Sequence, residues 1–261
     1  MDYSKMLPRE VRALIRQGVI TGQTSGMCEG YAQGNLLILP REQAYDFLLF
    51  TQRNPKSCPL LEVGDVGSPL VRKMADNADI ARDIPKYRVW EYGKLTGEYT
   101  DISRFWREDF VYFLIGCSFS FEGELLSAGV PVRHIEEGCN VPMYVTSIPC
   151  APAGVFHGNM VVSMRPMPVS EAIRSTLITG GMPRVHGAPV HIGDPALIGI
   201  RDISRPDFGD AVSIAPGEVP VFWPCGVTPQ AALMQSKPAF AITHAPGHML
   251  ITDVKNIRLK Y

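Results

Sequence analysis

The chain has 261 residues, of which 46% are hydrophobic and 20% charged, and its formal net charge is −1. These values describe an ordinary globular protein, and without a Lys/Arg run or a basic patch we expect no nucleic-acid partner. A chain of this length exceeds the usual size of a single hydrophobic core. We therefore expect two lobes, or one large α/β domain that carries an insertion.

The sequence also argues against a membrane or secreted protein. Its first residues, MDYSKMLPREVRALIRQG, carry scattered charges and lack the apolar segment of a secretory signal. The longest uninterrupted apolar runs, such as residues 111–115, are far too short to span a bilayer. The six cysteines show no C-x-x-C spacing and no disulfide framework, which indicates reduced thiols and a cytoplasmic location.

Hydrophobic patterns in the first half predict alternating helices and strands. Pro8 begins a short amphipathic helix that ends at Gly18, and a polar, glycine-rich loop continues up to Asn35. The later elements are a strand at 36–39, a helix at 41–53, a strand at 58–63, a hairpin at 87–100, a strand at 110–115 and a helix at 121–127 that Ser120 caps. Such alternation is typical of a three-layer α/β/α domain.

The second half predicts a smaller lobe. Strands at 143–148 and 159–164, a helix at 169–178 and a short element at 189–192 form a ββαβ succession, which suits an α+β two-layer sandwich. We expect this lobe at residues 130–200, inserted into a main domain made of residues 1–129 and 201–261. The remaining elements are strands at 196–200, 211–214, 219–223, 240–244 and 249–253 and a helix at 229–235.

The stretch at residues 110–140 carries the main candidate site. A buried strand breaks at Gly116-Cys117-Ser118 and a helix follows, so backbone N–H groups and the positive helix end face the sheet's edge. Cys117 offers a thiol and Ser118 a hydroxyl at this turn. A cation, an imidazole and two carboxylates then come close together, as acid–base chemistry on a small anion requires; they are Arg133, His134, Glu136 and Glu137. The simpler interpretation is a solvated charged loop.

The remaining histidines are further candidates, but no metal is expected. His244 and His248 have the i, i+4 spacing that suits zinc on a helix, yet the Pro-Gly pair between them excludes a regular helix. His186 and His191 lie in glycine-rich loops without a tight metal spacing. Histidines satisfied by nearby backbone are the simpler interpretation. The G-x-G-x-x-G fingerprint is absent, and we expect no nicotinamide, flavin or other cofactor.

Long runs of the chain resemble the D-glutamate cyclase family, whose bacterial members are labelled hydro-lyases. The runs are ITGQTSGMCEGYAQGNLLILP, FLLFTQRNPKSCPLLEVGD, FLIGCSFSFE, PVRHIEEGCNVPMY, VHGAPVHIGDP, RPDFGDAV, VPVFWPCGVTPQAA and FAITHAPGHMLITD. They extend from about residue 10 to residue 253, nearly the whole chain. The resemblance implies a two-lobed α/β fold and the loss of water as D-glutamate closes to 5-oxo-D-proline.

That reaction suggests roles for the candidate residues. It needs a cation for the α-carboxylate, a base for the ammonium, an acid for the departing oxygen and donors for the oxyanion. Arg133 or Arg165 could supply the cation. The acid and base candidates are His134, Glu136, Glu137, His244 and His248. The turn at Cys117 and Ser118 would hold the oxyanion. The expected substrate-aligning residues are Gln23, Thr24, Ser25, Asn35, His186 and His191.

A second hypothesis is a non-catalytic protein that binds a small carboxylate or amino acid, because binding and acid–base pairs use the same side chains. Under either hypothesis the partner is a small molecule, not a membrane. Whether the chain forms a homo-oligomer stays open.

We also expect the candidates to meet in space. If the strands of the main domain are parallel neighbours, the loops at 22–35, 116–120 and 244–248 converge at one sheet edge. We expect His134 or Glu136, Ser118, Asn35 and one of His244 and His248 to line a single cleft. The alternative is a set of scattered loops that are polar because they are exposed.

Overall fold

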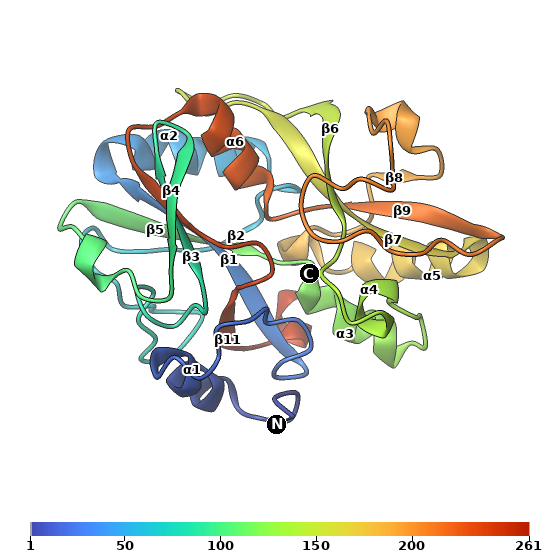
Figure 1. Cartoon of the computed structure of the whole chain (residues 1–261), viewed down its shortest axis with the longest axis horizontal. Coiled ribbons are helices and arrows are strands. Elements are labelled where there is room, and N and C mark those ends of the chain that lie inside the picture. Colours follow the sequence, from blue (N-terminus) through green and yellow to red (C-terminus); the bar gives the residue numbers. More distant parts are fainter. Residues whose placement is uncertain (1, 261) are drawn as a thin grey trace.

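The computed structural model describes residues 2–260 and contains two sheets that meet near the middle of the molecule (Figure 1). The larger sheet has the order β2-β5-β1-β10-β3-β4, with β11 also paired to β1; its strands are β1 Tyr31–Pro40, β2 Leu60–Val63, β3 Tyr87–Glu91, β4 Lys94–Tyr99, β5 Phe110–Gly116, β10 Ala241–His244 and β11 Leu250–Lys255. The smaller sheet has the order β6-β7-β9-β8; its strands are β6 Met143–Pro149, β7 Asn159–Pro168, β8 His191–Ile192 and β9 Glu218–Pro224. Helices and sheets thus share the chain, which confirms the mixed α/β class.

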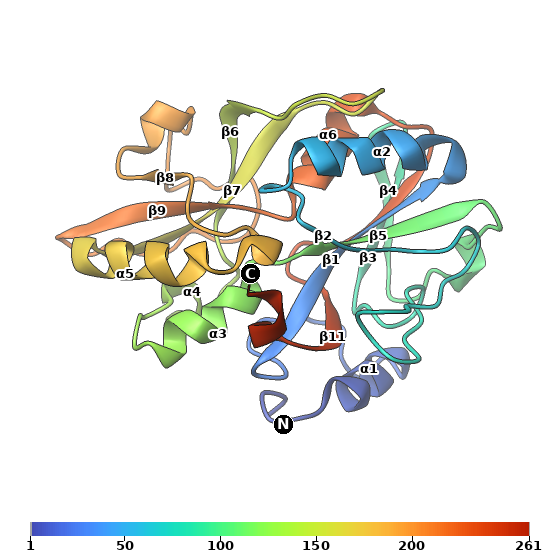
Figure 2. The ribbon, with the colours of Figure 1, turned by 180° about the vertical axis from the view of Figure 1, so that it is seen from behind.

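Helices cover both sheets. They are α1 Pro8–Arg16, α2 Arg41–Arg53, α3 Phe119–Ser127, α4 Arg133–Glu136, α5 Val169–Gly180 and α6 Thr228–Ser236. Short 3-10 turns occupy Ser103–Phe105, Pro183–Val185, Pro195–Ile198 and Asn256–Leu259. In both ribbon views α2 and α6 lie together over the larger sheet, while α3 and α5 lie together beside the smaller one (Figure 2). Among residues 2–260, no helix combines the length and apolar character needed to cross a membrane.

The expectation of parallel neighbours is wrong, because the paired strands of both sheets run antiparallel. Chain order explains the difference. β1, α2 and β2 follow one another as in a parallel unit, but β5 lies between β1 and β2 in the sheet and runs opposite to both. Alternating helices and strands in the sequence do not reveal such an intervening strand.

β1 is the central strand and is longer than predicted. Its residues from Ala32 to Pro40 are buried, and alternate side chains face two apolar clusters. Leu37 and Leu39 pack with Phe47 of α2 and Leu233 of α6. The first half of the strand was expected to be loop because of its polar residues. These are satisfied internally: Gln33, for instance, donates from its side chain to the carbonyl oxygen of Thr24 at 2.8 Å.

Three further expectations need correction. Where a strand was expected at residues 196–200, Pro195–Ile198 form a 3-10 turn, because the side chain of Asp194 accepts from Ala196 N–H and Gly199 ends the turn in a left-handed conformation. Residues 211–214 have no regular structure. Helix α3 begins at Phe119, so Ser120 lies inside it and its hydroxyl accepts from Gln33 N–H at 3.0 Å.

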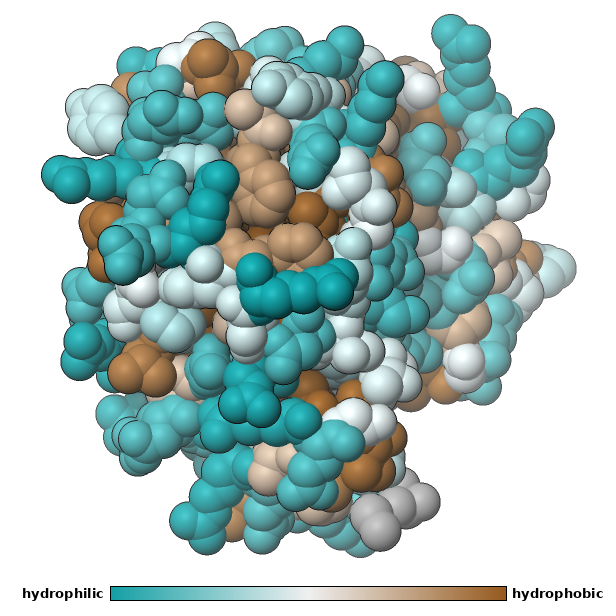
Figure 3. Space-filling view, turned by 60° about the vertical axis from the view of Figure 1, so that its left-hand side comes forward, coloured by the Kyte–Doolittle hydropathy of each residue, from teal (hydrophilic) through white to brown (hydrophobic). Residues whose placement is uncertain are grey.

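The second sheet extends beyond the expected insertion, since β9 pairs with β7 along its length. The division of the chain into domains stays a prediction, as do the three-layer and sandwich descriptions. The face on the side of the larger sheet is mostly hydrophilic, with apolar side chains in several separate places (Figure 3).

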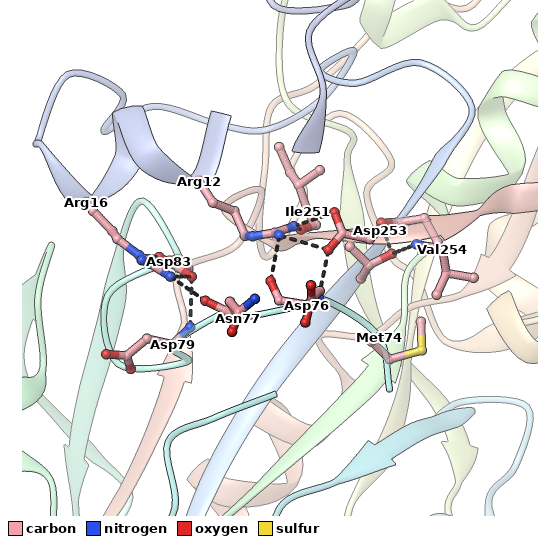
Figure 4. A network of polar contacts seen from close by, with 12 residues as sticks. Arg12, Arg16, Met74, Asp76, Asn77, Asp79, Asp83, Ile251, Asp253 and Val254 are labelled. Carbon is pink, nitrogen blue, oxygen red and sulfur yellow. Dashed lines mark hydrogen bonds and ion pairs between the residues drawn. The ribbon is translucent and has the colours of Figure 1, made fainter. Parts of the chain in front are cut away.

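Two arginines fix helix α1 to the rest of the fold (Figure 4). Arg12 is buried and donates to Ile251 O at 2.9 Å and to Asp253 Oδ2 at 2.9 Å. Arg16 pairs with the buried carboxylate of Asp83. These charge-assisted bonds join the N-terminal helix to β11 and to the irregular segment after β2.

Replacing Arg12 by alanine should therefore lower the free energy of unfolding by about 1.5–3 kcal/mol, the usual loss for hydrogen bonds to charged groups. Urea unfolding measures this change. Alanine at the exposed Arg9 of the same helix is the control and should change stability by no more than about 0.5 kcal/mol. Equal losses in the two variants would show that the buried contacts of Arg12 do not stabilise the fold.

Candidate active site

A small cavity of about 20 Å³ lies where the two sheets meet. We call it the junction cavity. The larger sheet contributes residues at or next to β1, β5, β10 and β11, and the smaller sheet contributes residues that flank β6 and β9. The lining residues are Asn35, Cys117, Ser118, Phe119, Asn140, Val141, Met143, Cys225, Val227, His244, Gly247 and Met249.

The register of β1 explains why these segments converge. β5 ends at Gly116 opposite Gly34, and β10 pairs Thr243 with Leu37, so it ends one residue later beside Leu36. Both strand ends therefore reach the middle of β1 next to Asn35. The expected convergence occurs, but an antiparallel register produces it rather than a shared edge of parallel strands.

Two helices begin at the junction cavity. Ser118 directly precedes α3, Val227 directly precedes α6, and both residues line the cavity. The first turns of a helix leave backbone N–H groups without helical partners, and the helix dipole places partial positive charge there. Two such ends at one cavity favour a carboxylate or a developing oxyanion.

His244, at the end of β10, is one of the residues that line the cavity. Its Nδ1 lies 3.1 Å from Leu36 N and 3.2 Å from Leu36 O; we assign it as the acceptor of the Leu36 N–H, which places the ring proton on Nε2. Within residues 2–260, this buried Nε2 has no hydrogen-bond partner. Burial lowers the pKa of His244 to about 4, so the imidazole is neutral at physiological pH. His244 therefore offers an N–H donor to whatever enters the cavity.

Two asparagines complete the polar lining. The Nδ2 of Asn35 donates to Gly116 O at 2.8 Å, and a Cβ at Gly226 would lie only 1.9 Å from that nitrogen. Asn140 is fixed through its backbone, since its N–H donates to Asp210 Oδ2 at 3.0 Å. Its Oδ1 is buried and accepts no hydrogen bond from the described part of the chain. An unused acceptor thus lines the same cavity as the unused donor of His244.

The two cysteines of the cavity are thiols rather than thiolates. Burial raises the pKa of Cys117 well above its usual range and that of Cys225 to about 11. Each side chain lies just before a helix, but the helix dipole does not offset the loss of solvation. Neither group is an activated nucleophile at neutral pH.

A buried charged cluster adjoins the cavity through Ser118. Arg165 of β7 donates to Ser118 Oγ at 3.2 Å, to Ser163 Oγ at 3.0 Å and to the carboxylate of Glu122, with which it forms a close ion pair. The Nε2 of His134 lies 3.3 Å from Glu122 Oε1. Burial alone would raise the pKa of Glu122, but His134 and Arg165 outweigh it and lower the pKa to about 2. Glu122 is therefore ionised at any physiological pH.

The structure brings part of the expected set together. Asn35, Cys117, Ser118 and His244 line the junction cavity. His134 does not line it, but its ring stacks on Phe119, which does, with ring centroids 6.1 Å apart. Glu136, the alternative to His134, is exposed and pairs with Arg133.

The other candidates lie outside the lining of the cavity. Three are held by backbone carbonyl oxygens: His248 by Pro246 O, His186 by Lys56 O and His191 by Asp194 O, at 2.9, 3.0 and 2.7 Å. Glu137 is exposed and accepts from Ser213. Thr24 is buried, and its N–H donates to the carbonyl oxygen of Gly247. Gln23 and Ser25 are half-buried in the same loop.

Sequence reasoning missed three polar residues of this region. Asn140, Cys225 and Glu122 were not candidates. Cys225 and Cys117 each follow a strand and precede a helix, a repeated pattern that could have revealed Cys225. Glu122 lies on the buried face of an otherwise apolar stretch of α3, where a carboxylate signals a buried partner. Across residues 2–260, three or more His, Cys, Asp or Glu side chains nowhere gather as a metal site would require.

The buried histidines predict acid sensitivity. Burial lowers the pKa of His186 and His244 to about 4, from 6.5 in the unfolded chain. Between these values only the unfolded chain binds the protons, so lowering the pH should reduce stability. From pH 6.5 to 4.5 we expect a loss of roughly 2–3 kcal/mol per histidine in urea unfolding. His244→Gln should remove about half of this dependence; a pH-independent wild type would contradict the prediction.

The comparisons with known proteins confirm the resemblance seen in the sequence. Residues 111–253 match the model of the family described as D-glutamate cyclase. A protein of Clostridium beijerinckii named "Putative hydro-lyase" is 69% identical over 261 residues, which is 100% of both chains. "Putative hydro-lyase YcsI" of Bacillus subtilis is 60% identical over 251 residues, which is 96% of this chain and 98% of the relative. The chain therefore belongs to the D-glutamate cyclase family.

Proposed function

We propose that the protein is a hydro-lyase that closes D-glutamate to 5-oxo-D-proline and water at the junction cavity. One observation carries the location: the buried donor of His244 and the buried acceptor of Asn140 line the same cavity without partners in the described chain. Buried polar groups are nearly always hydrogen-bonded, so unused ones that face a common space indicate a ligand site.

The reaction sets clear demands. The substrate nitrogen must bond to the side-chain carboxyl carbon, and one carboxyl oxygen must leave as water. The two protons that the ammonium group loses end on that oxygen, so no outside oxidant or reductant is needed. The site must therefore stabilise negative charge on the carboxyl oxygens and hold the nitrogen against the carbon.

The residues of the cavity suit these demands. We assign the Nε2–H of His244 and the hydroxyl of Ser118 as donors to the carboxyl oxygens. The hydroxyl proton of Ser118 is available because its oxygen accepts from Arg165. The beginnings of α3 and α6 supplement these donors. Asn140 Oδ1 accepts from the substrate nitrogen and keeps it close to the reacting carbon.

Arg165 is then a positioning residue rather than the cation that binds the substrate. Its guanidinium N–H groups donate to Glu122, Ser163 and Ser118. The guanidinium also lies 5.5 Å from the Trp223 ring centroid. Arg133 lies at the surface in pairs with Glu136 and Glu218. We therefore assign the binding of the substrate carboxylate to the N-terminal ends of α3 and α6 rather than to an arginine.

Binding without turnover is the second candidate. It is favoured by the chemistry of the lining, in which thiols, amides, a hydroxyl and a neutral imidazole occur but no carboxylate. Such a set can hold an amino acid. It contains no carboxylate that could take up a proton, so catalysis would have to transfer the protons between groups of the substrate itself. The two candidates differ in whether the ligand is recovered unchanged.

Incubation with D-glutamate, followed by mass spectrometry, tests the proposal. We expect a product lighter by one water that co-elutes with 5-oxo-D-proline, and much slower conversion of L-glutamate. D-Glutamate that raises the melting temperature but is recovered unchanged would support binding instead. The six cysteines, all without disulfide partners, are consistent with the cytoplasmic location that we propose for this reaction.

A further inference from the structure

The junction cavity is too small for its proposed substrate. A volume of about 20 Å³ accommodates roughly one water molecule, whereas D-glutamate carries two carboxylates and an ammonium group. A larger pocket of about 130 Å³ lies between the loop at residues 26–31 and helix α3. We call it the outer pocket. Its polar lining includes Gln33 and the buried carboxylate of Glu122.

Phe119 lies between these two spaces. Within residues 2–260, it is the single residue that lines both the junction cavity and the outer pocket. It is half-buried, whereas the following residues, Ser120, Phe121 and Glu122, are buried. A residue that lines both spaces is the candidate for a side chain that separates them.

The contacts of the Phe119 side chain are apolar and stacking contacts, which a change of rotamer can break at low cost. The ring stacks on His134 with an interplanar angle of 22°, and it packs at the edge of the apolar cluster that contains Val141 and Val227. A phenylalanine side chain makes no hydrogen bonds, so a change of rotamer costs packing and leaves no buried polar group unpaired. The Nε2 of His134 in turn lies 3.3 Å from Glu122 Oε1.

We infer that Phe119 is a movable partition and that D-glutamate binds across the joined junction cavity and outer pocket. The inference rests on the proposed function. When the ring swings away from the cavity, the two spaces become one that is large enough for an amino acid. When the ring returns, it excludes water from the donors of His244 and Ser118.

The buried thiols of the cavity provide a readout that does not depend on turnover. Cys117 and Cys225 line the junction cavity, while Cys58 is buried in a separate apolar cluster. The experiment exposes the whole protein to methyl methanethiosulfonate, a small thiol reagent, and follows each cysteine by peptide mass spectrometry. In Phe119→Ala, Cys117 and Cys225 should react at least about tenfold faster than in the wild type, with Cys58 unchanged.

Leu126→Ala is the matched control, because Leu126 lies on the same helix and lines only the outer pocket. It should leave the reaction rates of Cys117 and Cys225 at wild-type values. Phe119→Leu offers the same comparison if the alanine variant does not fold. Unchanged rates at Cys117 and Cys225, or an equal increase at Cys58, would overturn the inference.

Added D-glutamate separates this inference from the proposed function. If both hold, saturating D-glutamate should slow the modification of Cys117 and Cys225 in Phe119→Ala. If Cys117 and Cys225 react faster in Phe119→Ala but D-glutamate does not slow them, the partition holds and D-glutamate is rejected as the substrate. If the wild type converts D-glutamate but replacing Phe119 leaves the modification rates of Cys117 and Cys225 unchanged, the proposed function holds and the partition is rejected.

Discussion

Replacing His244 by alanine should lower the turnover of D-glutamate by about 100- to 1000-fold, the usual cost of removing one donor to a developing oxyanion. The side chain provides the unpartnered N–H of the junction cavity, and no other imidazole lines that cavity among the described residues. The loss should fall on kcat as well as on kcat/KM, because the bond strengthens in the transition state. Steady-state kinetics of the purified variant measures it.

His248 provides the matched control. It lies in the same turn, its Nδ1 is already held by Pro246 O, and it does not line the cavity. Alanine at His248 should keep turnover within about a factor of three, because its half-buried side chain does not line the cavity. Near-normal turnover in folded His244→Ala would remove His244 from the mechanism.

Replacing Arg165 by methionine should lower the free energy of unfolding by about 3–5 kcal/mol, because it leaves the buried carboxylate of Glu122 without its main partner. Adding Glu122→Gln should restore part of this loss, since the second change removes the uncompensated charge. Urea unfolding of the two single variants and the double variant measures the coupling.

Arg174→Met is the control for this cycle. Arg174 pairs with Glu171 at the surface of α5, where a solvated ion pair contributes only about 0–1 kcal/mol. A loss at Arg165 no larger than the loss at Arg174 would show that the buried cluster does not stabilise the fold.

Local patterns in the sequence predicted most elements. The helix at 41–53, the hairpin at 87–100 and the strand at 110–115 occur close to where apolar periodicity and turn residues placed them. The failures have a common cause. Short apolar runs at 196–200 and 211–214 match a strand pattern but lack a neighbouring strand that would complete a ladder, and no local signal reports that lack.

The central turn was found for a sound physical reason. A buried strand that ends at small residues and starts a helix presents backbone N–H groups whatever the orientation of its neighbours. That reason holds for Ser118, which lies beside Asn35 and His244 in the junction cavity. The argument from parallel strands failed, because strand order depends on contacts between residues far apart in the chain.

The residues that were missed depend on tertiary contacts. Asn140 lies in an irregular segment, and only its backbone pairing with Asp210 fixes it at the cavity. Glu122 is recognisable as part of a charged cluster only when β7 brings Arg165 against it. Conversely, Glu136 and Glu137 looked suited to acid–base chemistry but are exposed in the structure. A solvated loop and a catalytic loop can show the same pattern of charged residues in the sequence.

A crystal structure with 5-oxo-D-proline tests most directly whether the junction cavity is the reaction site. We expect the lactam beside α3, with its oxygen near the Nε2 of His244, its nitrogen near Asn140 Oδ1 and the Phe119 ring displaced. A much larger open depression, of about 780 Å³, lies elsewhere and is lined by Lys86, Glu98, Tyr99, Thr100, Asp101, Ser103 and Arg104. A lactam bound there, with the junction cavity closed and unchanged, would contradict the account.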